Sequence, residues 1–265
     1  IEGPIGSNGS SYLFSGRRTF VDRWIKNITS YNYRTNGNND IGFSNYYFYD
    51  LNGKLNFQLG KKHKLLVSAY NGKDDFENEV DRVRQQGKVI ERGESNFGWK
   101  NRLATIRFNS ELSKKVYSKI SVYTSDYDFN SYDYDRFESY GDGIPDAFNY
   151  KASSYLSRII DKGARIDFDY IPSPTHFFKF GGGFIQHNFK PGLVNVSEKD
   201  SLVTIDEPLI KQDVESRIES PELVGDEYFG YLEDQISIGY GFLLNLGVHT
   251  SYISSDDTNY LNWQP

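Results

Sequence analysis

Apolar and polar residues alternate over long stretches of this chain. Between Tyr47 and Leu59 the odd-numbered positions are aromatic, Leu or Gly, and the even-numbered positions are polar or charged apart from Phe48. Successive side chains of a β-strand point to opposite faces, whereas a helix brings every third or fourth residue to one face. The alternation therefore predicts a β-strand with one apolar and one polar face.

The same alternation recurs along the chain and predicts about nine strands. Several of the stretches run to about a dozen residues, roughly twice the usual length of a strand in a globular protein. The predicted strands are Ser11–Arg18, Tyr47–Leu59, Leu65–Gly72, Ala104–Leu112, Tyr117–Phe129, Ala164–Tyr170, Phe177–Phe189, Tyr228–Ile238 and Leu244–Tyr252. We therefore expect an all-β chain.

The connections between these strands alternate in length. The short ones are Gly60–Lys64, Ser113–Lys115, Pro172–His176 and Gly239–Gly241. The long ones, rich in Asp, Glu, Asn, Ser and Gly, are roughly Thr19–Tyr46, Lys73–Gly98, Asn130–Gly163 and Lys190–Glu227. Within them, Arg82–Arg92 could form a short helix or a hairpin. Tight turns at one end and long loops at the other are typical of outer-membrane barrels, which have short periplasmic turns and long extracellular loops.

Alternation alone does not choose between a soluble β-sandwich, whose apolar face is packed in a core, and a membrane barrel, whose apolar face meets lipid. The strands are long enough to cross a bilayer at a tilt, which takes about 9–11 residues. Aromatic residues make up 16% of a chain whose mean hydropathy is only −0.63, and they gather near strand ends, where interfacial girdles need them. The polar face also carries full charges within strands, at Asp50, Lys54, Arg107, Asp167 and Asp169. We therefore expect part of a large antiparallel transmembrane β-barrel.

Composition narrows the possibilities further. The chain has no Cys and no Met and a net charge of −6. The missing Cys excludes disulfides and thiolate metal sites, and the negative charge argues against a nucleic-acid partner. No apolar run approaches the roughly 20 residues of a membrane helix. Because a chain normally keeps a Met, we expect an internal piece of a longer protein, whose other strands would complete the cylinder that a bilayer requires.

Several segments resemble a known family. Glu2-Gly3-Pro4-Ile5, followed by Ser11–Phe20 with Ser15-Gly16-Arg17-Arg18, is similar to the first barrel strands of TonB-dependent outer-membrane receptors of Bacteroidetes-type bacteria. The resemblance departs at Gly247-Val248-His249, where the family usually shows Gly-Xaa-Arg. It continues in order through Tyr47–Leu55, Ser68–Asp75, Trp99–Asn101, Gly181–Gly182, Phe189–Gly192, Tyr231–Asp234 and Pro265. It identifies residues 1–265 as the early part of the receptor barrel, without the plug.

The resemblance implies a 22-stranded barrel in the cell outer membrane, enclosing an N-terminal plug. It implies active import of a siderophore, vitamin, glycan or peptide, driven through the plug by the inner-membrane TonB–ExbB–ExbD complex. Outer-membrane lipid and a surface lipoprotein are the other partners that it suggests, and no enzymatic activity is expected. Two alternatives stay open: a passive porin or a surface adhesin or assembly barrel without TonB coupling, and a soluble all-β enzyme or carbohydrate-binding domain.

Few residues suggest a defined chemical site. Asp142 and Asp146 flank a Gly-Ile-Pro segment and resemble a calcium-binding loop, but further acidic ligands are missing, so a turn is the simpler interpretation. No two of the four His residues have the spacing of a zinc site, and no nucleophile or carboxylate pair follows from spacing. We predict no catalytic residue, no metal and no cofactor, and the ligand-binding residues stay unassigned.

Two further groups of residues could meet a plug or a ligand. Arg17 and Arg18 could together face plug carboxylates, although one lumenal and one interfacial arginine is the simpler interpretation. The three loops Lys73–Gly98, Asn130–Gly163 and Lys190–Glu227 are expected to set selectivity. Their aromatic residues could stack on a sugar or siderophore, or pack the loops together: Phe76, Phe97, Tyr134, Phe137, Tyr140, Phe148, Tyr150 and Tyr155.

Overall fold

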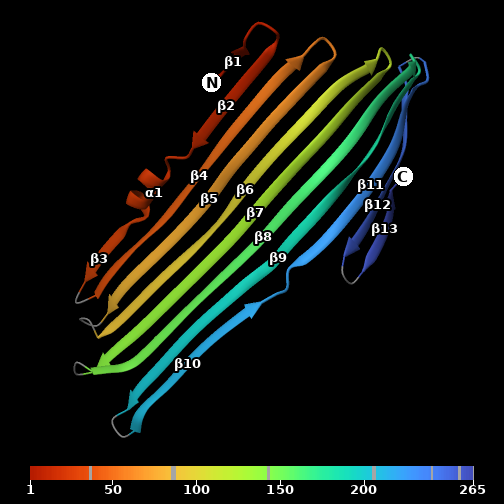
Figure 1. The fold of residues 1–265 in the computed structure, drawn as a ribbon. Coiled ribbons are helices and arrows are strands. Elements are labelled where there is room, and N and C mark those ends of the chain that lie inside the picture. Colours follow the sequence, from red (N-terminus) through yellow and green to blue (C-terminus); the bar gives the residue numbers. More distant parts are fainter. Residues whose placement is uncertain are drawn as a thin grey trace.

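The computed structural model describes residues 1–35, 38–84, 88–141, 144–204, 207–239, 241–255 and 258–264. These residues form one antiparallel sheet of thirteen strands and one short helix (Figure 1). The sheet is open, because β1 (Glu2–Ile5) pairs only with β2 and β13 (Asn259–Gln264) pairs only with β12. The expected all-β antiparallel fold is confirmed.

Most strands form hairpins with their neighbours in the sequence. The sheet order is β1-β2-β4-β5-β6-β7-β8-β9-β11-β12-β13, while β3 pairs with β4 and β10 pairs with β9. The remaining elements are β2 (Ser10–Arg18), α1 (Asp22–Thr29), β3 (Tyr31–Thr35), β4 (Asn38–Leu59), β5 (His63–Arg84), β6 (Val89–Ser113), β7 (Val116–Gly141), β8 (Ile144–Ser173), β9 (His176–Thr204), β10 (Glu207–Glu219), β11 (Leu223–Ser237) and β12 (Leu243–Ser255).

The nine predicted strands lie essentially within β2, β4 to β9, β11 and β12, and the structure adds β1, β3, β10 and β13. The short connections are where the sequence predicts them, at one end of the sheet that we call the short-turn end. The three predicted long loops Lys73–Gly98, Asn130–Gly163 and Lys190–Glu227 are wrong, because β-strands occupy nearly all of their described residues. Ladder hydrogen bonds persist there although the alternation of apolar and polar residues fades, because pairing needs a neighbouring strand and not an apolar face.

The segment Arg82–Arg92 is a hairpin rather than a helix. Arg82 pairs with Glu91 and Val83 pairs with Ile90, so β5 and β6 stay in register up to the residues that the structure describes on either side of 85–87. β8 has 30 residues, or about 100 Å at about 3.3 Å per residue. Hairpins of this length carry the opposite end of the sheet far away from the short-turn end.

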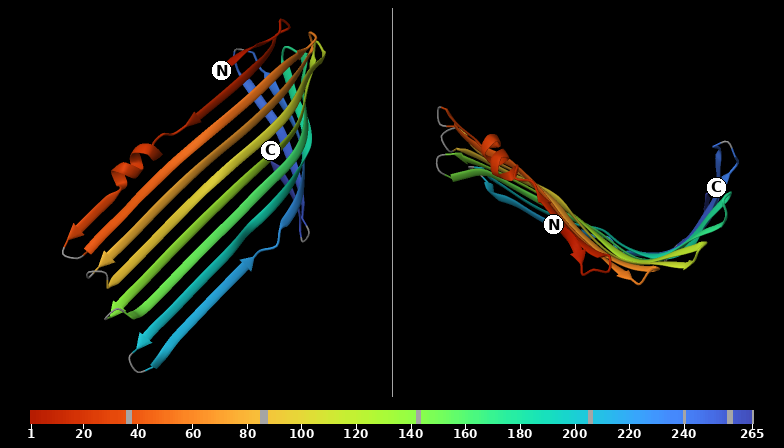
Figure 2. Two further views of the ribbon diagram at one scale, coloured as in Figure 1. Left: turned by 60° about the vertical axis from the view of Figure 1, so that its left-hand side comes forward. Right: turned by 90° about the horizontal axis from the view of Figure 1, so that it is seen from above.

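The sheet is a single curved layer (Figure 2). No large apolar side chain among those that the structure describes is buried, and the buried polar or charged residues are Ser10, Ser110, Ser118, Ser121, Glu138 and Ser251. A soluble sandwich would instead bury its apolar face between two sheets. The sandwich alternative therefore does not fit the described part of the chain.

Glycines let aromatic rings lie close to the backbone of this sheet. The ring of Tyr123 on β7 covers Gly163 on β8, where an added Cβ would lie 2.4 Å from Tyr123 Cζ. Likewise, Phe229 on β11 covers Gly183 on β9, where a Cβ would lie 2.7 Å from the same ring's Cζ. A side chain at Gly163 would displace the ring, and one at Gly183 would also lie 2.6 Å from the carbonyl oxygen of Ala164, so close approach explains the two glycines.

The predicted loop Thr19–Tyr46 contains α1, β3 and the start of β4. Thr29 Oγ1 donates to the carbonyl of Ser44 at 2.8 Å and ties the end of α1 to β4, while Trp24 and Ile28 stay exposed. Among the described residues no helix is both long and apolar enough to span a membrane.

Candidate functional site

The strand register sorts the side chains onto two faces. Leu55, Val67, Ile106, Val122 and Ala164 are direct neighbours across five strands, so they share one face. We call this the apolar face and the opposite one the polar face. Exposed side chains of the apolar face near the short-turn end form an apolar band that includes Phe14, Leu51, Ile106, Ile120, Val122, Ile166, Phe180, Leu232, Leu246 and Val248.

On the polar face, two pairs of opposite charges lie near the short-turn end. Arg165 Nε lies 2.7 Å from Asp167 Oδ1, to which the hydroxyl of Tyr231 donates at 2.6 Å. The guanidinium also lies 5.7 Å from the ring centre of Phe229. A neighbouring ion pair joins Lys119 to Asp169 at 2.8 Å. The two cations and two carboxylates therefore each have a partner on this face.

His187 joins three strands on the polar face. Its Nδ1 lies 2.8 Å from Asp161 Oδ1 on β8, and its Nε2 lies 3.2 Å from Glu227 Oε2 on β11. The structure nevertheless has no group of three or more His, Asp or Glu side chains arranged to hold a metal, as far as it describes the chain. The contacts make His187 a hydrogen-bonding link between β8, β9 and β11.

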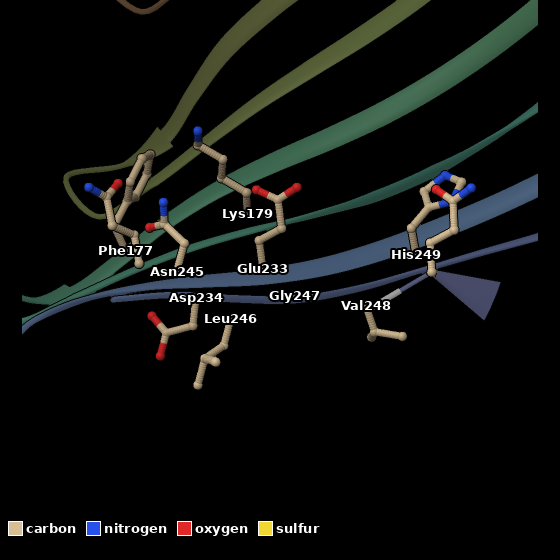
Figure 3. Close-up of a pocket in the computed structure, with 11 residues that line it drawn as sticks. Phe177, Lys179, Glu233, Asp234, Asn245, Leu246, Gly247, Val248 and His249 are labelled. Atoms are coloured by element: carbon tan, nitrogen blue, oxygen red, sulfur yellow. The ribbon is translucent and has the colours of Figure 1, made fainter. Parts of the chain in front are cut away.

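A hollow of about 440 Å³ opens at the short-turn end of β9, β11 and β12. Figure 3 shows Lys179, Glu233 and His249 projecting to one side of these strands, and Leu246 and Val248 projecting to the other. The hollow thus offers a cation, a carboxylate and an imidazole on the polar face. Such a mixture suits a polar ligand or a polypeptide surface better than an apolar molecule.

The aromatic residues expected in loops are carried by strands. Phe76 and Phe97 face each other across β5 and β6 with ring centres 4.8 Å apart, and Trp99 follows Phe97 at 6.2 Å. The strand register places these three rings on the polar face, together with Phe137 and Tyr155. The register places Tyr134, Phe148 and Tyr150 on the opposite face, where Tyr134 and Tyr150 pack edge to face at 5.4 Å. Rings therefore pair across the strands on both faces, and Phe148 also lies 5.5 Å from the guanidinium of Arg136.

Beyond the apolar band, the apolar face carries a row of ion pairs. Arg102 on β6 lies 2.5 Å from Asp128 and 3.1 Å from Asp126, both on β7. Arg158 on β8 lies 2.7 Å from Asp126 and 3.1 Å from Asp128. Two arginines and two carboxylates therefore link three strands at the border where the apolar face becomes charged.

Arg17 and Arg18 point to opposite faces, as the simpler interpretation predicts. Arg17 is directly opposite Asp50 and pairs with it on the polar face, and Tyr70 donates to the same carboxylate at 2.6 Å. Arg18 lies 5.4 Å from the ring centre of Tyr47 on the apolar face. The calcium interpretation falls on residues 142–146, whose side chains lie outside the described part of the structure.

Glu138 is the one carboxylate that is buried among the described side chains, with 6% exposure. It lies on β7 far from the short-turn end and accepts hydrogen bonds from Arg136 Nε and Tyr140 Oη, each at 2.6 Å. Burial alone would raise the pKa of Glu138, but the hydrogen bonds from Tyr140 and Arg136 outweigh it and lower the pKa. The ionised carboxylate is therefore the stable form here.

Sequence reasoning missed Trp99 and the two arginines of the ion-pair row. The sequence did hold a usable signal. Arg102 is an even-numbered position like Ala104 and Ile106, and Trp99 is an odd-numbered position like Arg107, so each shares a face with those residues in a continuous strand. Extending the predicted strands backwards from Ala104 and from Ala164 would have assigned each of these residues to its face. The predicted strand began only at Ala104, and Arg158 lay in the predicted loop Asn130–Gly163.

No protein-family model matches the chain, and no curated protein matches it either. Function must therefore be inferred from the two faces of the sheet and from the segments that resemble a receptor barrel.

Proposed function

We propose that this sheet is part of a transmembrane β-barrel in the bacterial outer membrane. We further propose that the barrel belongs to a TonB-dependent receptor importing a scarce nutrient such as a siderophore, glycan or peptide. The observation that carries the membrane proposal is the apolar band, which stays exposed across the sheet while the opposite face is polar.

Exposure of the band is costly in water. Ile106 is 54% exposed, Val122 56% and Leu246 56%. Burying one such side chain fully is worth about 1.5–3 kcal/mol, so lipid contact along the whole band is a large stabilisation. On β4 the band runs from Leu51 to Leu59, which matches the about 9–11 residues that a tilted strand needs to cross a bilayer.

The polar face suits the inside of such a barrel. Its ion pairs, Arg165 with Asp167 and Lys119 with Asp169, would be stable beside water or a plug domain and unstable in hydrocarbon. Lipid also leaves no partner for free backbone groups, so the proposal requires further strands to pair with β1 and β13. The curvature of the sheet in Figure 2 is compatible with such a cylinder.

The strand extensions give the proposed barrel a direction. The apolar band lies near the short-turn end, β4 to β9 continue far beyond it, and β10 lies wholly beyond it. Short turns face the periplasm in outer-membrane barrels. The long hairpins would therefore project outside the cell and place the rings of Phe76, Phe97 and Trp99 above the membrane, where an incoming ligand would meet the polar face.

Energy coupling to TonB is supported by the sequence resemblance, most clearly by Glu2–Ile5 and Ser11–Phe20. Import through the TonB–ExbB–ExbD complex would act on a plug inside the barrel. The charged hollow around Lys179, Glu233 and His249 is the part of the polar face best suited to contact such a plug.

Two measurements test the proposal with the full-length protein. Membrane fractionation should place it in the outer membrane and require detergent for its extraction, and recovery in the aqueous fraction would refute the membrane location. Nutrient uptake by the expressing strain should then depend on the inner-membrane energy-coupling complex. Uptake or adhesion that is unchanged without that complex would instead indicate a passive porin or an adhesin.

A further inference from the structure

We infer that the apolar face contains a binding site for an anionic phospholipid, with an acyl chain in a hollow and the headgroup phosphate at Lys162. The inference depends on the membrane location proposed above, but it assigns a specific ligand to a defined place on the barrel wall.

The hollow lies in the apolar band across β5 to β9. Its volume is about 670 Å³, and the apolar-face side chains at its floor and sides include Val67, Ala69, Ala104, Ile106, Val122 and Ala164. Phe184 on β9 borders it as well. A hollow of this composition offers van der Waals contact and almost no hydrogen-bonding group, which suits a hydrocarbon chain.

Small residues on neighbouring strands create this hollow. Ala69 is directly opposite Ala104, and Ala164 lies beside Val122 and Phe184. Ile106 and Val122, in contrast, stand up from the sheet with more than half of their surface exposed. Alanines beside larger apolar side chains leave a depression that a flexible chain can fill.

Lys162 lines the same hollow at its border with the ion-pair row. It lies between Thr124 on β7 and Gln186 on β9, and its side chain is exposed. Within the described part of the structure Lys162 has no ion-pair partner, whereas Arg102 and Arg158 are held by Asp126 and Asp128. Lys162 is therefore a cation available to an anion that arrives from the lipid side.

The position of this lysine fits a headgroup phosphate. A lysine can extend its apolar stem along the band and keep its ammonium at the membrane interface. In the proposed orientation the border lies at the outer leaflet. An acyl chain in the hollow would bring a phosphate close to the ammonium, where one interfacial lysine contributes about fivefold in affinity for anionic lipid.

Native mass spectrometry of the full-length protein, released from detergent micelles, tests the site. The two probes are phosphatidylglycerol, which is anionic, and phosphatidylcholine, which has the same phosphate but no net charge. We expect retention of phosphatidylglycerol over phosphatidylcholine by about fivefold, loss of that preference in Lys162→Gln, and weaker retention of both lipids in Ala164→Leu, which fills the hollow. Lys179→Gln, on the polar face, is the matched control and should keep the preference.

Equal retention of the two lipids by the wild type would overturn the inference, as would an unchanged preference in Lys162→Gln. Because these measurements follow an extraction that has required detergent, their failure leaves the membrane location intact. Recovery of the protein without detergent, in contrast, would refute the location and this site together.

Discussion

Arg158 on β8 donates two hydrogen bonds to the carboxylate of Asp126 on β7, from Nε to Oδ1 at 2.8 Å and from Nη2 to Oδ2 at 2.7 Å. The two residues are not directly opposite, because Asp126 pairs with Ile160 and Arg158 therefore reaches diagonally across the strands. Asp126 also contacts Arg102 on β6 at 3.1 Å. One carboxylate thus fixes the relative positions of β6, β7 and β8 at the border of the apolar band.

Arg158→Lys should weaken this link although the charge is kept, because an ammonium cannot form the paired contacts of the planar guanidinium. The pair is partly exposed, so we expect the free energy of unfolding to fall by about 0.5–1 kcal/mol. Urea unfolding of the refolded protein in micelles measures it. Arg82→Lys, whose single contact to Glu91 is 3.5 Å long, is the matched control. Equal losses in the two variants would contradict a role for the paired geometry.

Ile106→Arg and Leu103→Arg should differ strongly, although both replace an exposed apolar residue of β6. Ile106 lies in the apolar band, where an arginine in lipid costs about 2–4 kcal/mol near the bilayer centre. Leu103 points to the polar face and should tolerate the charge. From the proposed membrane location we expect the yield of folded protein in the membrane fraction, scored by its resistance to unfolding in cold SDS, to fall only for Ile106→Arg. Similar losses would argue against lipid contact on the apolar face.

Gly163→Ala should destabilise the sheet by about 1–3 kcal/mol, because the new Cβ would overlap the ring of Tyr123. Removing the ring in Tyr123→Ala should relieve that overlap, so the double variant should lose less than the sum of the two single losses. Gly230→Ala is the control, since its Cβ would meet no atom closer than 3.8 Å. Additive losses in the urea unfolding experiment would show that the ring is free to move away.

Glu138→Gln should lower the stability of the β7 extension at pH 7 by about 1–2 kcal/mol, because Arg136 and Tyr140 lose their ionised acceptor. The folded-state pKa of Glu138 is lowered, so its contribution is present above the unfolded carboxyl pKa of about 4.3 and is lost as the pH falls through the folded pKa. Thermal unfolding of the wild type and the variant between pH 7 and pH 3 should therefore converge on acidification. A constant difference across that range would contradict the pairing.

The position of the strands was predictable, but their length was not. Alternation between Tyr47 and Leu59 identifies β4 because one face of that segment is apolar. On β7 it fades after Phe129, yet the ladder continues as far as Gly141. Backbone hydrogen bonds need a neighbouring strand and not an apolar face, so nothing within one segment of the sequence marks where pairing stops.

The candidate sites depended even more on neighbours. Lys162 and Ala104 are nearly sixty positions apart in the sequence and line one hollow only because the register of β6, β7 and β8 aligns them. The same holds for Phe76 and Phe97, which the sequence assigned to one loop and which face each other as a cross-strand pair.

By itself the sequence determined that the chain forms β-strands and which residues share a face of each strand, because both follow from the two-residue repeat of a local backbone conformation. Only the tertiary structure decided that these strands join in one curved layer without a second sheet. It also decided how far they extend, and which charges and small side chains meet across them. Those outcomes depend on register between distant segments, and a shift of one residue would exchange the two faces.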